Sequence, residues 1–249
     1  MTDKPSVIRE TDDEARALAR RLLRSARYVA LAVIDPQNGY PSVSRVLLAT
    51  DTDGSAVILV SALSAHTKAL HVDQRVSLLA GEPGKGDPLA HPRLTLYCLA
   101  EPVERQSAVH DRLRARFIAR HPKAKLYIDF PDFRFFRLIP QSASLNGGFG
   151  RAYLLPGEDF RIAPASAGDL SGREVEVLQE LVSTKPELAQ ELATSRCGQK
   201  PGKWAFCGVD RAGLDLICGD LLVRYDFACL VDSRTELYLE LSNTVNRIP

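Results

Sequence analysis

Apolar residues in the first third of the chain follow one helical pattern and then several strand patterns. They recur at helical spacing over residues 15–26, and Thr11 with Glu14 forms a T-x-x-E capping box that predicts Thr11 as the helix cap. Short apolar runs follow, separated by turn sequences rich in Asp, Asn and Gly, and they predict strands over residues 28–34, 41–50 and 56–62. Such closely spaced strands indicate antiparallel pairing, because parallel strands need a long crossover connection.

Helices and strands continue to alternate through the middle of the chain. The pattern predicts a short helix over residues 64–72 and a longer one over residues 106–121. Further strands are predicted over residues 75–80, 93–103, 133–139 and 142–155. The sequence Asn146-Gly147-Gly148-Phe149-Gly150 interrupts the last of these strands.

A stretch rich in Gly, Pro, Ala and Ser, residues 156–172, is interpreted as a linker. It divides the chain into a domain of residues 1–158 and a smaller domain of residues 168–249. In the smaller domain Ser171 and Glu174 are predicted to cap a helix. The elements predicted after it are helices over 187–194 and 233–245, a hairpin over 204–218 and a strand over 221–227. The smaller domain is therefore expected to be α+β.

Composition excludes several classes of protein. The chain has 249 residues, of which 45% are apolar, and its 32 basic and 31 acidic residues give a net charge of +1. This near-neutrality argues against a general nucleic-acid partner. Because no apolar run approaches the length of about 18 residues that a membrane helix needs, and the N-terminus lacks a hydrophobic signal region, we expect a cytoplasmic protein with no membrane partner.

The chain has five cysteines, an odd number, with no C-x-x-C pair. A disulfide framework or a tetrahedral zinc site typically has paired, regular spacing. We therefore predict buried, reduced thiols and no metal site. The sequence also lacks the H-E-x-x-H, G-x-S-x-G and P-loop motifs, so no catalytic residue is assigned.

One cluster has the chemistry of a phosphate site. Ser44 and Arg45 lie in a predicted strand, and the sequence Ser61-Ala62-Leu63-Ser64-Ala65-His66-Thr67-Lys68 begins a predicted helix. Free N–H groups and the positive end of a helix attract an anion, which Arg45 can bind through two donors and Lys68 through its charge. The alternative is a capped helix on which His66 and Lys68 are solvated. The spacing alone does not decide between them.

The second cluster is the glycine-rich sequence from Asn146 to Gly150. Its glycines permit positive φ angles and close approach of the backbone, and Phe149 is suited to cover an aromatic ligand. It is not a dinucleotide fingerprint, because both the G-x-G-x-x-G spacing and the βαβ context are missing. The alternative is a β-bulge or a tight bend.

These segments together resemble a known family. The motifs Ser44-Arg45-Val46, Ser61-x-x-Ser64-x-His66-Thr67-Lys68, Pro92-Arg93-Leu94-Thr95-Leu96 and Gly147-Gly148-Phe149-Gly150-Arg151 are similar to those of the pyridoxamine 5′-phosphate oxidase-like FMN-binding split barrels. Within that family the chain resembles the branch of bacterial haem-utilisation proteins, in which a small α+β domain follows the barrel. The resemblance is strongest over residues 10–155.

The resemblance implies an α+β protein with a six-stranded antiparallel Greek-key split barrel and a small α+β domain. It also implies a homodimer with FMN at the dimer interface. The residues that it suggests for the cofactor are Arg45, Ser61, Ser64, His66, Thr67 and Lys68 at the phosphate, Val46 and Leu47 beside the flavin ring, and Arg93, Gly148 and Phe149 near the flavin or the partner.

The function expected from this resemblance is an FMN-dependent oxidoreductase acting on a small planar substrate. The alternative is a haem-binding or haem-degrading protein, or a flavin or haem carrier or sensor without turnover. No Arg stands two residues before a His, so the R-x-H motif of the oxidase proper is missing and oxidation of pyridoxamine phosphate is not expected. Haem is the less favoured cofactor, because the haem-degrading relatives use a C-terminal histidine and this chain has none after His121.

Overall fold

The computed structural model describes residues 8–148, 150–163, 170 and 172–245. Contacts between Cα atoms divide the chain into two compact units, each built from several segments. We call the unit of residues 1–51, 55–113 and 125–161 the barrel unit, and the unit of residues 52–54, 114–124 and 162–249 the C-terminal unit. Each unit is described by itself.

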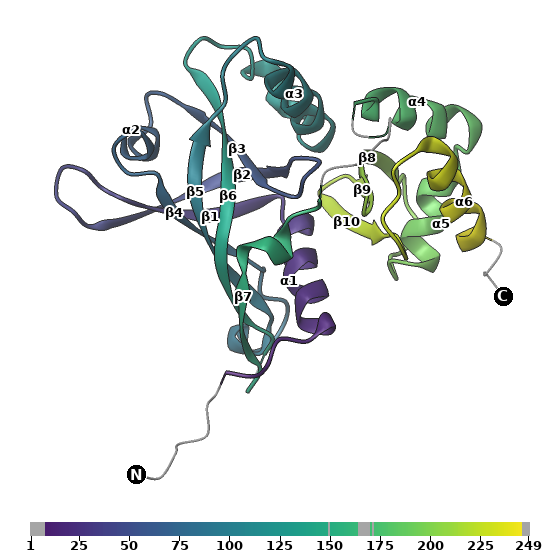
Figure 1. Cartoon of the computed structure of the whole chain (residues 1–249), viewed down its shortest axis with the longest axis horizontal. Helices are drawn as coiled ribbons and strands as arrows, with labels where there is room; N and C mark the ends of the chain where they lie inside the picture. The colour runs from purple at the N-terminus through teal and green to yellow at the C-terminus, as the bar shows by residue number, and fades with distance from the viewer. Residues whose placement is uncertain (1–7, 149, 164–169, 171, 246–249) are drawn as a thin grey trace. The chain divides into compact units, whose positions relative to one another are not determined.

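A closed antiparallel barrel forms the barrel unit (Figure 1). Its strands pair in the order β3-β2-β1-β4-β5-β6, and pairing of β3 with β6 closes the ring. The strands are β1 (Tyr28–Ile34), β2 (Pro41–Thr50), β3 (Ala56–Ser61), β4 (Arg75–Ala80), β5 (Arg93–Pro102) and β6 (Phe133–Asn146), and β7 (Ala152–Pro156) pairs with β6 outside the ring. The expected six-stranded barrel is confirmed.

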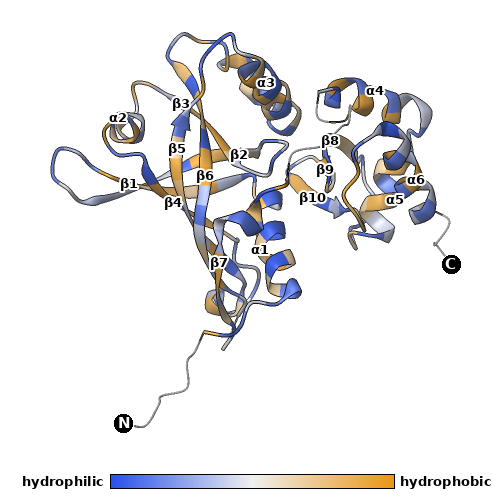
Figure 2. Ribbon diagram, in the orientation of Figure 1, coloured by the Kyte–Doolittle hydropathy of each residue, from blue (hydrophilic) through white to orange (hydrophobic). Residues whose placement is uncertain are grey.

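Alternating burial explains why these sequences form a barrel. On β1 the side chains of Val29, Leu31 and Val33 are buried, whereas the intervening residues are partly exposed. Antiparallel neighbours share a face, so Leu31 stands beside Leu78 of β4, which is also buried. The inward side chains of the strands form one hydrophobic core, and hydrophobic (orange) segments are frequent along the strands of the barrel (Figure 2).

Helix α1 (Asp13–Ser25) packs on the barrel through Ala15, Ala19 and Leu23 and contacts β5. Its cap differs from the prediction: the Asp12 carboxylate, not Thr11, accepts a hydrogen bond from the Ala15 N–H at 2.8 Å. Thr11 instead donates its hydroxyl to the carbonyl of Leu154 at 2.8 Å. The capping-box prediction is thus wrong by one residue, because Thr11 is used to attach the chain to β7.

The long strand β6 corrects a second prediction. Sequence patterns suggested separate strands before and after Pro140, but β6 is continuous from Phe133 to Asn146. The register against β5 shifts by one residue here, since Tyr97 pairs with Ser142 and Cys98 with Pro140. This irregularity in the ladder lets a proline lie inside a strand without ending it.

The first part of the chain also contains helices α2 (Ala65–Val72) and α3 (Ala108–Arg120). Three short 3₁₀ segments also occur: η1 (Pro88–Ala90), η2 (Pro122–Leu126) and η3 (Gly157–Phe160). The part of α3 from Arg114 onwards is assigned to the C-terminal unit. Among the helices that the structure describes, none is long and apolar enough to cross a membrane.

The C-terminal unit contains a three-stranded antiparallel sheet in the order β10-β9-β8, with three helices. The strands are β8 (Ala205–Asp210), β9 (Gly213–Cys218) and β10 (Leu221–Asp226), and the helices are α4 (Glu174–Thr184), α5 (Leu188–Ser195) and α6 (Arg234–Val245). The sheet and helices share a core that includes Leu181, Leu192, Trp204, Leu216 and Leu241. The expected small α+β unit is confirmed.

The cap predicted for α4 is not formed by Glu174. Its side chain is buried and accepts a hydrogen bond from the Val209 N–H at 2.9 Å, so it is committed to strand β8. The other predicted cap residue, Ser171, lies outside the described residues.

All five cysteines are free thiols, but the prediction that they are buried holds for only two of them, Cys98 and Cys207. Cys197 and Cys218 are half-buried and Cys229 is exposed. Burial raises the pKa of the Cys98 thiol to about 12, so this thiol is protonated at neutral pH.

Candidate functional site

Polar side chains gather where β3 ends and α2 begins. β3 pairs with β6 as far as Ser61, which stands opposite Phe133, whereas its ladder with β2 extends only from Thr50 to Leu48. β2 and β3 therefore separate beyond Leu48, and the chain turns from Ser61 into α2. We call the polar side chains at this point the α2 cluster: Ser44, Ser61, Ser64, His66 and Thr67.

The three hydroxyls at the start of α2 are held by short hydrogen bonds. Ser61 donates to Oδ2 of Asp132 at 2.6 Å, and Ser64 donates to the Ser61 carbonyl at 2.7 Å. The Ser64 and Thr67 hydroxyls lie 2.7 Å apart, with Thr67 as the donor because Ser64 has already given its proton. The Ser64 side chain does not cap a helix N–H. Asp132 is a member of the site that the sequence analysis missed, since a lone Asp after Pro131 gives no distinctive signal.

His66 is the titratable group of the α2 cluster. Its Nδ1 atom lies 3.1 Å from the hydroxyl of Ser44, which belongs to the β2 face that also carries buried Val46. Partial burial lowers the pKa of the imidazole below its usual 6.5, because burial disfavours the charged ring. The ring is therefore neutral at physiological pH, and one of its nitrogens carries a free lone pair.

Arg45 is adjacent to Ser44 in sequence but lies on the opposite face of β2, because successive strand residues point to opposite sides. Its guanidinium stands 5.0 Å from the ring centre of Tyr28, which pairs across the ladder with Leu47. A hydrogen bond to Glu82 raises the pKa of the Tyr28 phenol. One chain thus brings Ser44 and His66 together and directs Arg45 away from them, while Lys68 is exposed on α2.

Arg93 and Gly148 lie in another part of the barrel. Arg93 pairs with Asn146 at one end of β6, whereas Ser61 pairs with Phe133 at the other end. The strand path between these pairs is roughly 40 Å at about 3.3 Å per residue. A single chain therefore does not bring Arg93 and Gly148 to the α2 cluster.

Gly148 forms the turn between β6 and β7. Its φ is +103°, and a Cβ atom there would lie 2.9 Å from the carbonyl oxygen of Ala90, so only glycine fits. The Arg151 N–H donates to the Gly148 carbonyl at 3.2 Å, as in a tight bend. Phe149, the residue predicted to cover an aromatic ligand, lies outside the described residues.

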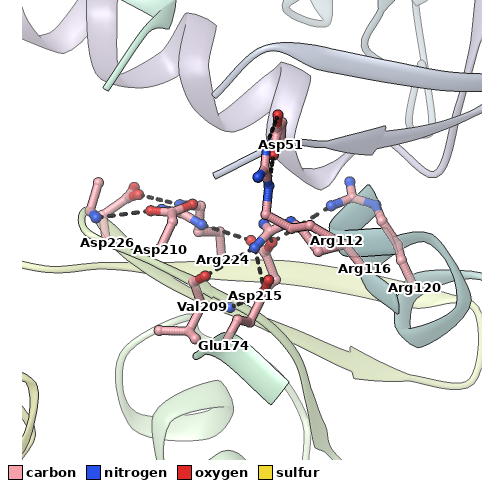
Figure 3. Close-up of polar contacts among 11 residues, drawn as sticks. Asp51, Arg112, Arg116, Arg120, Glu174, Val209, Asp210, Asp215, Arg224 and Asp226 are labelled. Carbon is pink, nitrogen blue, oxygen red and sulfur yellow. Dashed lines mark hydrogen bonds and ion pairs between the residues drawn. The ribbon is translucent and has the colours of Figure 1, made fainter. Parts of the chain in front are cut away.

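A second polar cluster belongs to the C-terminal unit (Figure 3), and its members are buried except for Asp226, whose side chain is about half exposed. At its centre Arg224 donates to Asp215 at 2.9 Å, to Asp210 at 2.6 Å and to Asp226 at 2.9 Å. We call the whole set the ionic network: Arg116, Arg120, Glu174, Asp210, Asp215, Arg224 and Asp226.

Helix α3 supplies the other two guanidinium groups of the ionic network. Arg116 donates to Glu174 and to the Val209 carbonyl, the latter at 3.0 Å, and Arg116 and Arg120 each stand 3.8 Å from Oδ2 of Asp215. Burial disfavours the charge on Arg116, but Glu174 and the nearby aspartates outweigh it and raise its pKa. For Asp215 burial acts against ionisation, yet the arginines prevail and lower its pKa. These groups keep their charges near neutral pH, so the ionic network is a structural element.

Across the described ranges, no group of three or more His, Cys, Asp or Glu side chains is placed to hold a metal ion. The α2 cluster combines one neutral imidazole, several hydroxyls, the Asp132 carboxylate and an exposed lysine, and this chemistry makes it the candidate functional site of the barrel unit.

Two curated proteins are similar to about half of this chain. The non-canonical heme oxygenase HOZ of the Arabidopsis thaliana chloroplast is 39% identical over 121 residues, which is 48% of this chain and 36% of that protein. The heme oxygenase HutZ of Vibrio cholerae is 33% identical over 136 residues, which is 52% of this chain and 74% of that protein. The chain thus spans little more than a third of the first relative and about three quarters of the second.

These relatives correct the expected function. Both are named heme oxygenases, which contradicts the expectation of an FMN-dependent oxidoreductase and favours the haem alternative. The missing C-terminal histidine therefore argued too strongly against haem. Its absence excludes only a ligand from the C-terminal tail and leaves other histidines, such as His91, His110 and His121, open.

Two solved structures match nearly the whole chain. The Agrobacterium tumefaciens protein Atu2129, of unknown function, is 32% identical with a TM-score of 0.83 and covers 96% of this chain and 100% of its own. A heme binding protein from Mycobacterium smegmatis is 26% identical with a TM-score of 0.54 and covers 98% of both chains. The match to both proteins includes the C-terminal unit as well as the barrel.

A family model described as "CREG, beta-barrel" matches residues 10–161, more than half of the chain. This range includes every strand of the closed barrel and the α2 cluster. The chain belongs to the CREG beta-barrel family, within the split-barrel group that includes haem-utilisation proteins.

Proposed function

We propose that this protein binds haem and takes part in its oxidative degradation. The observation that carries the proposal is the neutral, half-buried His66, held by Ser44 at the α2 cluster in a chain whose relatives are named heme oxygenases. A neutral imidazole is a common ligand of haem iron, and its orientation is normally fixed by a hydrogen bond to the other ring nitrogen. Ser44 supplies such a bond when Nδ1–H donates to its hydroxyl.

Comparison with the other histidines favours His66. His121 is buried against the ring of Phe117, at 4.8 Å between centres, and His91 uses Nε2 on the Lys85 carbonyl at 3.0 Å. His110 has its Nδ1 atom 3.3 Å from Oδ1 of Asp111, so this nitrogen already has a partner on the same helix. His71 is exposed, without a hydrogen bond to orient it among the residues described.

Haem also needs an apolar surface and cations for its two propionates. Leu63, directly before α2, is 80% exposed and offers apolar surface at the candidate site. Lys68 on α2 is an exposed cation suited to a carboxylate, whereas Arg45, on the outer face of β2, would serve the site of a second copy of the chain. The residues present therefore fit a haem group. Bound haem would supply the iron at which oxygen is activated, while the protein would hold its plane and its propionates.

The site is proposed to be completed by a second copy of the chain. Arg45 lies on the other face of β2 and Arg93 at the far end of β6 from the α2 cluster, and in the proposed dimer both would serve the partner's site. The outer face of β2, β1, β4 and β5 also carries large exposed apolar side chains: Ile34, Val43, Leu79, Tyr97 and Leu99. A symmetric dimer through this face would cover them. Sedimentation of the protein and of a Leu79→Asp variant tests this, with a dimer and a monomer expected.

The proposed function is tested by titrating the purified protein with haem and then adding ascorbate under air. We expect a saturable shift of the Soret band, followed by its loss as the tetrapyrrole is opened. Saturable binding without loss of the band on reduction would indicate a carrier or sensor and would contradict degradation. Absence of a saturable shift would contradict haem binding altogether.

A further inference from the structure

The C-terminal unit contains a hollow of about 290 Å³ that the proposed haem function does not use. It lies where the end of β10, the end of α5 and the last turns of α6 meet. Its volume is close to the lower limit of ordinary small-molecule sites. The residues that line it are Arg196, Tyr225, Asp226, Ala228, Glu240, Asn243 and Thr244.

Each of two carboxylates in the hollow accepts a hydrogen bond on only one of its oxygens. Oε1 of Glu240 accepts from the Ala228 N–H at 2.9 Å, and Oδ1 of Asp226 accepts from Arg224 at 2.9 Å. Within the part of the chain that the structure describes, the second oxygen of each has no hydrogen-bond partner. These bonds hold both carboxylates in place and leave one acceptor on each.

Two other polar side chains of the lining, Arg196 and Tyr225, make hydrogen bonds to α6. Arg196 donates to the Thr244 carbonyl at 2.6 Å, and the Tyr225 hydroxyl lies 2.6 Å from the Thr244 hydroxyl. Thr244 gives its own proton to the Glu240 carbonyl at 2.8 Å, so Tyr225 is the donor in that pair. Tyr225 also contacts Phe227, at 5.9 Å between ring centres, and its aromatic ring is part of the lining; an aromatic ring attracts cations.

We propose that this hollow binds a small organic cation, such as a primary amine with an apolar body. The ammonium group would donate to the spare oxygens of Glu240 and Asp226, and the apolar body would lie against Tyr225 and Ala228. Two carboxylates against one guanidinium give the lining a net negative charge, which favours a cation over an anion.

The test is a titration of the full-length protein with benzylamine, followed by ligand-observed NMR and calorimetry. Benzyl alcohol has nearly the same shape without the charge, and benzoate carries the opposite charge. We expect saturable binding of benzylamine, at least tenfold weaker binding of benzyl alcohol and no binding of benzoate. Equal binding of benzyl alcohol, preferential binding of benzoate, or no binding of benzylamine would overturn the proposal.

Variants locate the site. Glu240→Gln keeps an acceptor for the Ala228 N–H but removes the charge, and it is expected to weaken benzylamine binding about tenfold. Glu236→Gln, one turn earlier on α6 and outside the lining, removes the same charge and should leave binding unchanged. Should Glu240→Gln disturb folding, Ala228→Leu fills the hollow without changing charge and should abolish binding. Unchanged affinity in Ala228→Leu would place any binding elsewhere.

Discussion

The α2 cluster and the ionic network both gather polar side chains, but they differ in burial and in what they leave for a ligand. In the ionic network Arg224 is buried and directs its donors at three aspartates, so its hydrogen-bonding capacity is used within the protein. In the α2 cluster His66 is half-buried and neutral, and only Nδ1 is bonded within the described chain. The first arrangement stabilises a fold, and the second is suited to bind a ligand.

The density of charged residues is a poor guide to function in this chain. Breaking one partner of a buried ion pair leaves an uncompensated charge in a low-dielectric interior, which is costly. A half-buried imidazole beside a hydroxyl contributes little to stability, yet it offers a lone pair. Substitutions should therefore separate the two clusters: those in the ionic network are expected to change unfolding, and those in the α2 cluster are expected to change the proposed affinity for haem.

The largest expected effect follows removal of the central cation of the ionic network. Arg224→Met should lower the free energy of unfolding by about 3–5 kcal/mol, because Asp210 and Asp215 remain buried without it. Trp204, the only tryptophan, lies in the core of the C-terminal unit, so its fluorescence during denaturation reports on this unit. Lys203→Met, which removes an exposed cation, is the control. Equal midpoints for both variants would show that the network is not structural.

A smaller loss is expected at Gly208, which lets the chain pass close to the ionic network. A Cβ atom here would lie 2.8 Å from Oδ2 of Asp215, so Gly208→Ala should cost about 1–3 kcal/mol through overpacking. Gly172→Ala adds a methyl group in open space and serves as the matched control. Denaturation followed at Trp204 measures both, and a wild-type midpoint for Gly208→Ala would mean that Asp215 is free to move away.

Ser44→Ala tests how the α2 cluster orients its histidine. Removal of the hydroxyl leaves Nδ1 of His66 without its bond, so haem affinity should fall about tenfold. The free energy of unfolding should change little, because His66, which loses its hydrogen-bond partner, is only half-buried. Ser42→Ala, on the same face of β2, is the control. A haem affinity equal to that of the control would indicate that Ser44 does not position the ligand.

The smallest effect concerns pH. Burial lowers the pKa of His66 below 6.5, so the folded protein binds fewer protons here than the unfolded chain and is more stable above this pKa than below it. Haem affinity should accordingly be constant near pH 7 and fall as acid protonates the imidazole, with a midpoint below 6.5. Haem titrations of the wild type and of His66→Ala from pH 5 to 8 measure this dependence. If haem affinity falls in the same way in His66→Ala, the titrating group is another residue.

Sequence patterns predicted most of the secondary structure and the barrel, because periodic burial along a strand or helix is a local property. They did not reveal that β6 continues through Pro140, since a register shift against β5 accommodates the proline. Nor did they reveal the ionic network, in which Arg116 meets Glu174 from a distant part of the sequence. Sequence patterns predict Ser44, Arg45, His66 and Lys68 as one anion site, but in the structure Arg45 lies on the opposite face of β2 from Ser44.

His66 is proposed to bind the haem iron. An equilibrium haem titration of the His66→Ala variant tests this role directly. His71→Ala, on the same helix and exposed, is the matched control. We predict that His66→Ala binds haem at least tenfold more weakly, with a Soret maximum different from that of the wild type, and that His71→Ala matches the wild type in both. Wild-type affinity and Soret position in His66→Ala would contradict the claim.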